Sequence, residues 1–488
     1  MARTRRTVAA RSQPATGPHP AARSDARTSR APRPPMESAP TRTLAEWVAG
    51  PHPLPAATVA MAKRCLLDWL GAGFAGCALP AGVIAARLAV RLGGPAEATL
   101  LRGGRVACTG AALANGIASH ATEMDDLHRA SVMHLGTVTI PAALALAERE
   151  HSSGRRLLEA LVCGYEVGAR IAEASGPSHY HFWHVTGTAG AFAAAAASSV
   201  ILGLTAPEIL NALGSAGTLS AGLWEFLTDG AMSKTLHAGR AAETGVLCAL
   251  LAREGFSGAA AILEGEKGFL RAMAGGGDPG RLTKGLGDGY QIDRNSFKLH
   301  AACGHTHPAI DAALELRRQG VEAAEIEEVR VRTFRTALDV TGIRDPRNPY
   351  QAKFSLPFCV ALALIRGRVG LDEFTPATLA DPAVRGLAGR VVLEEEAACT
   401  LAYPGRWQAS VVATWGGGRR REMRMDAPRG SPENPASDEE LAEKFSRLSA
   451  GWISTGHREA LVRAIAALDE TTDVAAIPWG CDHLAGAR

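Results

Sequence analysis

The sequence predicts a mainly α-helical protein that carries a smaller α+β domain. Apolar residues recur at spacings of three and four from about residue 43 to residue 275, which is the period of helices with one buried face. Near residue 290 the pattern changes, and Val329, Val331 and Thr333 alternate with arginines in the period of a β-strand. Because 488 residues exceed what one compact core usually holds, we expect two domains, the second inserted into the first.

Local signals place the elements in order. Capping boxes, in which a Ser or Thr precedes a Glu by three residues, predict the starts of helices. They are Thr43 with Glu46, Thr205 with Glu208, and Ser437 with Glu440. Further strands are predicted over residues 390–393, 408–415 and 420–425, the last two joined by a glycine turn. We therefore expect a disordered basic tail over 1–40, a helical domain over 41–288 and 433–488, and an α+β domain over 289–432.

The first 36 residues differ in charge from the rest. They hold eight arginines and one acid, a charge of +7, so the formal net charge of +3 leaves −4 for the remaining chain. A mildly acidic remainder predicts no nucleic-acid partner. The arginine-rich start is also typical of an organellar transit peptide, but its prolines interrupt an amphipathic helix. We favour a disordered tail, or translation that starts at Met36.

Two further features concern location. Nine cysteines are scattered without a C-x-x-C pair, which is typical of reduced thiols in a cytoplasmic protein and disfavours an iron–sulfur cluster or the usual structural zinc. Residues 185–204 form an uncharged run long enough to raise the question of a membrane span. Because alanine and glycine dominate this run, we predict a buried helix and no membrane partner.

The first of four polar segments covers residues 115–141. Five of its acids and histidines crowd between two apolar helices: Glu123, Asp125, Asp126, His128 and His134. Burying so many charges without a purpose is costly, and a carboxylate beside an imidazole can give the histidine a pKa that suits a general base. A solvated loop between helices is the alternative, and the charge count alone does not decide between the two.

The second segment places His179, His181 and His184 immediately before a glycine-rich helix. A position near a helix N-terminus favours the neutral form of His184, which can act as a base. The three histidines could instead chelate a metal ion. Their spacing fits no known zinc helix, so we expect no metal.

Two basic segments follow. Lys234, His237 and Arg240 recur at three-residue steps, so one face of a helix is cationic, and the small residues around Gly239 would let another backbone or a ligand approach. A solvated helix face is the alternative. The last segment lies at the predicted domain junction, where clefts form or hinges lie, and its basic residues are Lys298, His300, His305 and His307.

Five blocks of the sequence resemble the MmgE/PrpD family, whose members include 2-methylcitrate dehydratase, cis-aconitate decarboxylase and an iminodisuccinate epimerase. The blocks span about residues 40 to 470 and read ANGIASHATEMDDLH with MHLG, HVTGTAGAFAAAAA, SKTLHAGRAAETG, FKLHAACGHTHPAIDAA and AKFSLPFCVALAL. The resemblance implies an all-helical domain with a smaller α+β lid, commonly as a homodimer without metal or organic cofactor.

The resemblance also implies roles for individual residues. His134 and His184 would exchange protons with the substrate, and Lys234 and Lys298 would face its carboxylates. We predict as catalytic residues His134, His184, Glu123 and Asp126, and as substrate-binding residues Lys234, Lys298, His128 and His237. The predicted partner is a small carboxylate substrate.

Three positions depart from the family pattern. Glu123 stands where aspartate is usual, Leu127 where a threonine or serine is common, and Phe358 where a tyrosine often follows the proline. The two missing hydroxyls favour a substrate unlike citrate-type acids. The expected function is a cofactor-independent lyase that dehydrates a small hydroxy-polycarboxylic acid. An isomerase, an epimerase or a decarboxylase on the same scaffold is the alternative, and a non-catalytic binding protein is a third hypothesis.

Overall fold

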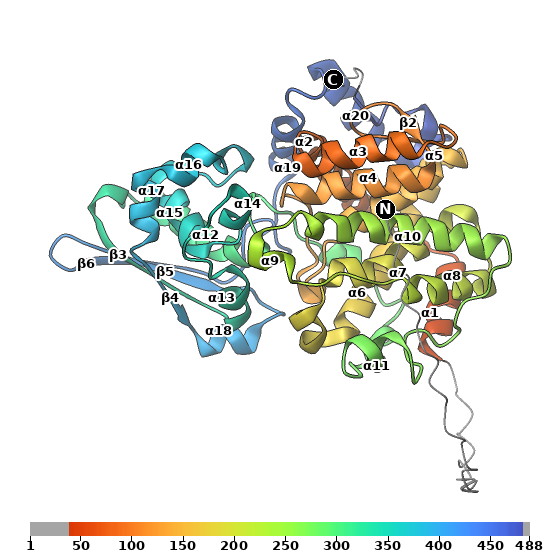
Figure 1. Ribbon diagram of the computed structural model, residues 1–488, viewed down its shortest axis with the longest axis horizontal. Coiled ribbons are helices and arrows are strands. Elements are labelled where there is room, and N and C mark those ends of the chain that lie inside the picture. Colours follow the sequence, from red (N-terminus) through yellow and green to blue (C-terminus); the bar gives the residue numbers. More distant parts are fainter. Residues whose placement is uncertain (1–38, 482–488) are drawn as a thin grey trace, which may run out of the picture. The chain divides into compact units, whose positions relative to one another are not determined.

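The computed structural model describes residues 39–481, and most of them lie in helices (Figure 1). The mainly α fold class is therefore confirmed. The tail predicted over residues 1–40, with its transit-peptide alternative, lies outside the described residues except at its last two positions. The helices before residue 290 are α1 (Pro40–Ala49), α2 (Ala56–Gly76), α3 (Pro80–Leu92), α4 (Cys108–Ala121), α5 (Gly136–Arg149), α6 (Gly154–Phe182), α7 (Val185–Leu202), α8 (Ala206–Thr218), α9 (Phe226–Asp229), α10 (Ser233–Arg253) and α11 (Phe269–Met273).

Two of the three predicted capping boxes form. Those that begin at Thr205 and Ser437 cap α8 and α19 (Asp438–Ser449). The box at Thr43 is wrong, because α1 already begins at Pro40 and Thr43 lies within it. A proline at the first helical position costs no hydrogen bond, because the backbone N–H that it lacks would have no partner within the helix. The sequence reading also missed a short hairpin of β1 (Ala98–Thr99) and β2 (Arg105–Val106).

Helix α7 is at the centre of the helical part and packs against α5, α6, α8 and α10. It is long and apolar enough to cross a membrane, but 94% of that window is buried inside the protein, as expected for a core helix. Its alanines leave room for neighbouring helices to approach closely. A Cβ at Gly245 of α10, for example, would lie 2.3 Å from the side chain of Ala194. The buried helix predicted over 185–204 is confirmed.

Close packing of α4 against α10 positions the chemistry described below. A Cβ at Gly239 would lie 2.4 Å from the carbonyl oxygen of Leu113, so only glycine allows this crossing. The small residues of α10 therefore admit another backbone rather than a ligand. The crossing brings the residues that follow the end of α4 beside Lys234, in the first turn of α10.

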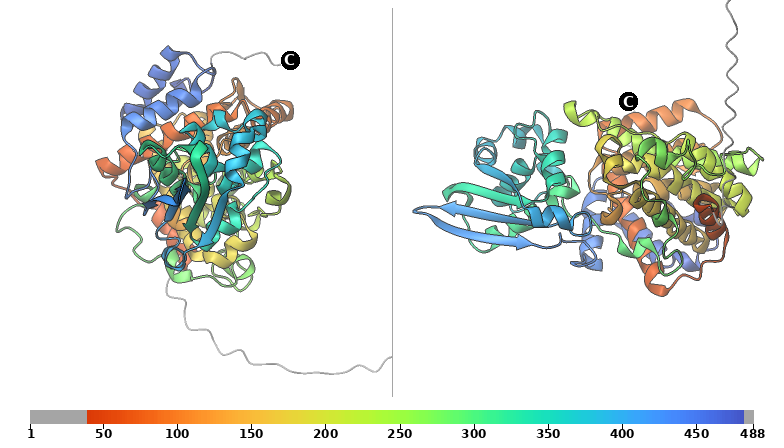
Figure 2. Two further views of the ribbon diagram at one scale, coloured as in Figure 1. Left: turned by 90° about the vertical axis from the view of Figure 1, so that its left-hand side faces the viewer. Right: turned by 90° about the horizontal axis from the view of Figure 1, so that it is seen from below.

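Four strands form a mixed sheet in the order β4–β3–β5–β6. They are β3 (Ile326–Thr333), β4 (Val391–Glu395), β5 (Ala409–Trp415) and β6 (Arg419–Met425), close to the predicted strands. β3 pairs in parallel with β4 and antiparallel with β5, so that Val331 lies opposite Leu393 on one side and Val411 on the other. Helices α12 (His307–Arg318) and α15 (Leu356–Arg366) pack against the sheet (Figure 2). Shorter helices accompany them: α13 (Arg335–Thr341), α14 (Pro349–Ala352), α16 (Pro376–Ala380), α17 (Pro382–Ala388) and α18 (Ala397–Ala402).

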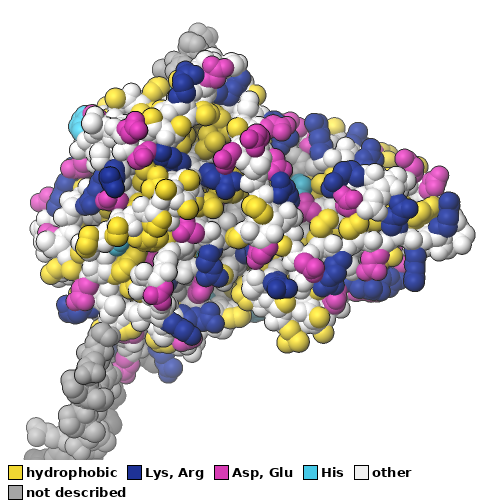
Figure 3. Space-filling model, turned by 180° about the vertical axis from the view of Figure 1, so that it is seen from behind, with side chains coloured by type: hydrophobic (Ala, Val, Ile, Leu, Met, Phe, Trp, Pro, Cys, Tyr) yellow, Lys and Arg dark blue, Asp and Glu magenta, His cyan; other side chains and the backbone are white. Residues whose placement is uncertain are grey.

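The chain returns to the helical part after the sheet. Helix α19 packs against α2, and α20 (Thr455–Ala466) contacts α2 as well. A buried ion pair joins Lys444 of α19 to Asp68 of α2 at 2.5 Å. The helical part is thus built from both ends of the chain, while the boundaries at 288 and 432 remain predictions. On the face shown in Figure 3, the basic and acidic side chains of the described residues are interspersed over the helical part.

Candidate active site

The loop between α4 and α5 carries the first polar segment and is buried. Glu123, Asp125, Asp126 and His128 are each at most 2% exposed, and His134 is 8% exposed. The solvated-loop alternative is therefore wrong. Glu123 has a φ of 58°, in the left-handed region that non-glycine residues rarely adopt. Strained backbone of this kind persists only where the surrounding structure enforces it, which is common at functional sites.

A buried carboxylate and two lysines form the charged centre of the site. One oxygen of Glu123 pairs with Nζ of Lys234, and the other lies 3.2 Å from Nζ of Lys298. Burial alone would raise the pKa of Glu123, but the two ammonium groups hold it well below its usual range. Three residues far apart in the sequence therefore meet as a buried triad, and their roles toward a substrate remain predictions.

A third lysine, which the sequence reading missed, lies behind this triad. Lys353 is 4% exposed, and its Nζ donates to the carbonyl oxygen of Thr122 at 2.8 Å. Burial lowers the pKa of Lys353 to about 8, against the opposing charge of Glu123. The residue belongs to the AKFSLPF block, but its pattern of one lysine before an apolar helix is too common to single it out.

His134 is held in a defined orientation at the end of the loop. Its Nδ1 lies 2.8 Å from the carbonyl oxygen of Asp126 and 3.4 Å from a carboxylate oxygen of Asp125. Because a carbonyl can only accept, Nδ1 carries the proton and Nε2 has a free lone pair. Burial lowers the pKa of His134 to about 3 despite the carboxylate of Asp125. The ring is therefore neutral at neutral pH and its Nε2 can accept a proton, but this pKa lies further below the working pH than the sequence prediction of a general base requires.

A further histidine, His120, lies next to both His134 and His184, and the sequence did not predict it as a site residue. Its Nδ1 lies 2.6 Å from the carboxylate of Asp125. Its ring centroid lies 5.0 Å from that of His134 and 5.4 Å from that of His184, on which it stacks. His120 is in the last turn of α4, five residues before Asp125, and only that spacing could have indicated it.

His184 occupies the N-cap position of α7, which confirms its predicted place at a helix start. Its Nδ1 lies 3.2 Å from Nδ1 of His237, which comes from the second turn of α10. Burial lowers the pKa of His184 well below its usual value, and burial also lowers that of His237 to about 4. Both rings are thus neutral near pH 7. Arg240, by contrast, is half exposed and pairs with Glu243 on the surface.

These groups enclose a small chamber of about 20 Å³, which is close to the volume of one water molecule. Glu123, His134, His184 and Lys234 form its polar wall. The rest of its lining is mainly apolar or aromatic: Leu127, Val132, Tyr180, Trp224, Cys303, Gly304, His305, Phe354 and Trp407. His305 stacks on Trp407 with the ring planes 7° apart, and its Nε2 lies 3.3 Å from the Tyr403 hydroxyl. The chamber therefore combines charged groups on one side with apolar and aromatic side chains on the other.

Four of the eight predicted residues do not line the chamber: Asp126, His128, Lys298 and His237. Lys298 pairs with Glu123 and His237 contacts His184, and both of these partners line the chamber. The side chains of Asp126 and His128 make their hydrogen bonds elsewhere.

Asp126 accepts hydrogen bonds from the backbone N–H of Gly136 at 2.9 Å, the Tyr165 hydroxyl at 2.5 Å and the Asn295 amide at 2.6 Å. It holds the loop together, and Asp125 faces the histidines instead. The Nδ1 of His128 contacts the Ser131 hydroxyl at 2.8 Å, within the loop itself. The structure therefore does not support a contact of either residue with a substrate.

Two of the departures from the family pattern, Leu127 and Phe358, lie in different parts of the structure. Leu127 lines the chamber, so a hydroxyl is missing there. Phe358 is 2% exposed in the core around the sheet, with its ring 6.3 Å from that of Phe374, and it does not line the chamber. The chamber has a phenol from another position, Tyr180. The expectation that Phe358 deprives the site of a phenol is therefore wrong.

Among the described residues, His120, Asp125 and His134 could hold a cation, because one ligand atom of each lies within 4.8 Å of the others. The predicted alternative was His179, His181 and His184. His179 is instead occupied, with Nδ1 3.0 Å from the Met273 carbonyl and Nε2 2.7 Å from the Thr188 hydroxyl. The ammonium groups beside the new cluster disfavour a cation. The expectation of no metal remains a prediction.

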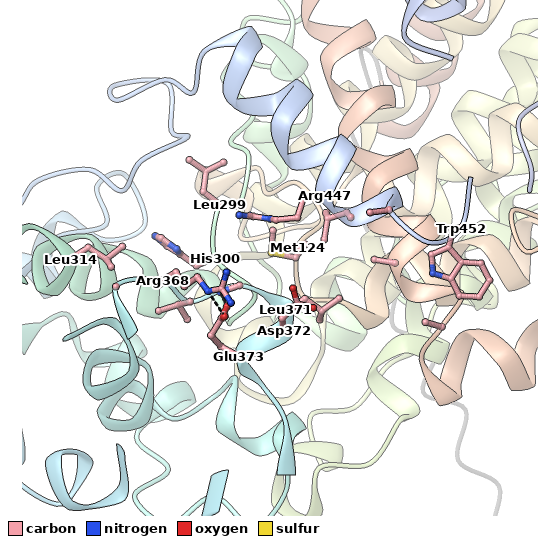
Figure 4. A pocket seen from close by; sticks show the side chains of 17 residues that line it. Met124, Leu299, His300, Leu314, Arg368, Leu371, Asp372, Glu373, Arg447 and Trp452 are labelled. Atoms are coloured by element: carbon pink, nitrogen blue, oxygen red, sulfur yellow. Dashed lines mark hydrogen bonds and ion pairs between the residues drawn. The ribbon is translucent and has the colours of Figure 1, made fainter. Parts of the chain in front are cut away.

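A second cavity of about 320 Å³ is lined by Met124 and Leu299, which follow Glu123 and Lys298 in the sequence (Figure 4). Figure 4 shows Arg368 paired with Glu373 at its centre, at 2.5 Å. His300 also lines it and is tied to Asp311 at 2.8 Å. His300 thus belongs to the junction between the helical part and the sheet, and the eight predicted site residues do not line this cavity.

Comparison with known proteins gives matches over most of the chain. Residues 42–282 match the MmgE/PrpD N-terminal domain and residues 300–470 the MmgE/PrpD C-terminal domain. The chain is 28% identical to the cis-aconitate decarboxylase-like protein oryM of Aspergillus oryzae, over 89% of this chain and 95% of the relative. It is 28% identical to the cis-aconitate decarboxylase of Homo sapiens, over 84% and 87%. It is 27% identical to the 2-methylcitrate dehydratase of Cupriavidus necator, over 70% and 74%.

Proposed function

The chain belongs to the MmgE/PrpD family, and from this premise we propose that it is a lyase that acts on a small tricarboxylic acid by acid/base chemistry. The relatives named above are a cis-aconitate decarboxylase, a cis-aconitate decarboxylase-like protein and a 2-methylcitrate dehydratase. The observation that carries the proposal is one small chamber walled by Glu123, Lys234 and two neutral buried histidines, with Lys298 paired to the second oxygen of Glu123.

In this proposal, the lysines hold the substrate and the histidines move its protons. Lys234 and Lys298 exchange Glu123 for carboxylates of the substrate. Nε2 of His134 then takes a proton from the carbon next to one carboxylate, and an ammonium group stabilises the negative charge that develops there. Positioned groups of these two kinds each typically contribute about 3 to 5 kcal/mol to lowering a barrier.

Dehydration needs an acid as well as a base. A bound tricarboxylate adds negative charge beside the rings, which raises the pKa of His184 toward neutrality. His184, once protonated, gives its proton to the leaving hydroxyl as the carbon–oxygen bond breaks, and water is released. His120 and Asp125 lie behind the two rings and act as positioning residues, because they fix the orientation of the imidazoles.

Decarboxylation is the second candidate, and the apolar side of the chamber favours it. A carboxylate placed against Leu127, Phe354 and Trp407 loses its hydration, whereas the carbon dioxide formed from it is uncharged. The carbon–carbon bond breaks, its electron pair stays on the substrate carbon, and a protonated histidine supplies the proton that this carbon takes up. The relatives that cover 84% or more of this chain carry the name of this reaction.

We further propose that the sheet-bearing part acts as a lid. One wall of the chamber comes from residues 123–234, and the other from residues 303–407. A chamber of about 20 Å³ is too small for a tricarboxylate, so the two walls must separate before the substrate binds. A homodimer and independence from metal ions remain part of the proposal. The first is tested by light scattering of the purified protein and the second by elemental analysis of active protein.

Incubation of the protein with cis-aconitate, citrate and 2-methylcitrate in deuterated water, followed by NMR, tests the reaction class. We expect loss of carbon dioxide or water from one acid. Loss of carbon dioxide should leave one deuterium on the carbon that takes up a proton. Loss of water should leave no deuterium in the product, and deuterium then enters only substrate whose proton next to a carboxylate exchanges before the hydroxyl leaves. His134→Asn and Lys234→Met should each reduce the rate at least a hundredfold. His151→Asn is a matched control, because the His151 side chain is 71% exposed and pairs with Asp473 outside the chamber. A rate equally reduced in all three variants, or no turnover of any acid, would contradict the proposal.

A further inference from the structure

A much larger cavity adjoins the chamber. Its volume is about 890 Å³, within the usual range for pockets that hold ligands of drug size. Val132, Tyr180 and Trp224 line both spaces, so the two share a wall made of these side chains. We call this space the outer cavity. None of the predicted site residues lines it.

The sequence of α6 explains why the outer cavity exists. Gly176 has a φ of 68° and a ψ of −175°, which breaks the helix, and Pro177 follows without an N–H to continue it. The segment after the break turns away and carries Tyr180. Small side chains, Ala172 and Ala174, line the cavity before the break. Space is therefore left at the point where a regular helix with larger side chains would fill it.

The outer cavity is apolar where it meets the chamber and acidic at its rim. Val185, Leu227 and Val340 lie on its walls together with the three shared residues. Its charged side chains include Asp278, Arg281 and Asp339, which are 64%, 55% and 54% exposed, and Glu173, which is 17% exposed. Asp339 also pairs with Arg335, so three carboxylates stand against two guanidinium groups, and the remaining negative charge repels a further anion. Carboxylates are therefore directed to the lysines of the chamber, and an uncharged group suits the outer cavity.

We propose that the outer cavity binds an apolar chain carried by the substrate, so that the preferred acid is a polycarboxylate with an unbranched alkyl substituent of several carbons. This inference rests on the proposed function, because the lysines must hold the carboxylate end. A tricarboxylate without such a chain leaves the outer cavity to water. An alkyl chain that passes between Val132 and Trp224 loses its contact with water along most of its length.

A series of citrates with alkyl substituents of one, three, five and seven carbons tests the proposal by calorimetric titration of the full-length protein. We expect the dissociation constant to fall by roughly two- to fourfold for each added methylene until the cavity is filled. The measured quantity is the ratio of the dissociation constants of the one-carbon and seven-carbon acids.

Filling the outer cavity with a larger side chain should reduce this ratio. Leu227→Trp on α9 and Val340→Trp on α13 narrow it from two different helices, and either should reduce the ratio at least tenfold. Thr228→Trp is the matched control for the first, because Thr228 is the next residue of α9, is exposed and does not line the cavity. It should leave the ratio within twofold of the wild-type value. Melting curves identify any variant that fails to fold, and the second variant then takes its place.

The outcomes separate the two proposals. Binding of the one-carbon acid with no gain along the series overturns the outer-cavity proposal and leaves the proposed function intact. An equal reduction of the ratio in Thr228→Trp also overturns it. Failure of every acid in the series to bind overturns the proposed function and this inference together.

Discussion

Replacing Glu123 with glutamine perturbs the charged centre of the chamber with little change in shape. Glu123 is 1% exposed, and the side chains of Lys234 and Lys298 that pair with it are 3% and 2% exposed. The variant Glu123→Gln leaves two buried ammonium groups without their counter-charge. Breaking a buried ion pair in this way usually costs about 3 to 5 kcal/mol. We expect the free energy of unfolding to fall by an amount in that range.

A bound polycarboxylate should reverse part of this loss. Its carboxylates supply the charge that the variant lacks, and they no longer compete with Glu123 for the two lysines. If the ligand regains about 2 kcal/mol, the variant binds it about 30-fold more tightly than the wild type does. Urea unfolding with and without citrate measures the stability change, and calorimetric titration measures the affinity.

Glu148→Gln is the matched control for this experiment. Glu148 is also buried, accepts a hydrogen bond from the backbone N–H of Thr99 at 2.9 Å and pairs with Arg105 at 2.8 Å, but it does not line the chamber. The control should lose stability without gaining affinity for citrate. The reasoning fails if Glu123→Gln is as stable as the wild type, or if it binds citrate no more tightly than Glu148→Gln does.

Three further predictions concern pH and the buried residues around the chamber. Burial lowers the pKa of His128, His134 and His305 to about 3, so the stability that their neutral forms contribute is complete above pH 6.5 and is lost as the pH falls toward 3. Between these two pH values each histidine makes the free energy of unfolding rise with pH by up to about 1.4 kcal/mol per pH unit. A urea midpoint at pH 5.5 equal to that at pH 7.5 would refute this prediction. The variant Asp126→Asn replaces one acceptor oxygen by an NH2 group, which then faces hydrogen-bond donors. The free energy of unfolding measured in urea should fall by about 1 to 3 kcal/mol. An unchanged midpoint would show that the hydrogen bonds of this carboxylate do not hold the loop. The variant Phe358→Tyr should destabilise the core around the sheet, because the added hydroxyl is buried there. Its affinity for citrate should equal that of the wild type. A clear gain in affinity would show that the side chain at position 358 contacts the bound acid.

Much of the fold could be predicted because local signals and tertiary structure agree. The alternation around Val331 predicts β3, and the sheet buries that face, so pattern and burial have the same cause. The box at Thr43 failed because a proline three residues earlier starts the helix equally well. The hairpin of β1 and β2 escaped because its two-residue strands are too short to have a period.

The site was predictable in part, for a different reason. Glu123, His134, His184, Lys234 and Lys298 stand in four blocks that resemble one family, and the close crossing of α4 and α10 brings two of these blocks together. Pattern alone could not have paired residues that are more than a hundred positions apart. The resemblance supplied that long-range information, and the ion pairs of Glu123 agree with it.

Asp125 and Asp126 illustrate what neither pattern nor resemblance can decide. The two carboxylates are identical in type and adjacent in sequence, but one contacts His120 at 2.6 Å and the other accepts the Tyr165 hydroxyl at 2.5 Å. Their directions depend on the path of an irregular loop that begins with a positive φ at Glu123, where no helical or strand period applies. A buried loop must also pair its own polar groups, so one of its carboxylates is used for that purpose. A polar loop between apolar helices therefore indicates chemistry, but it takes coordinates to separate the carboxylate that orients the histidines from the one that holds the loop.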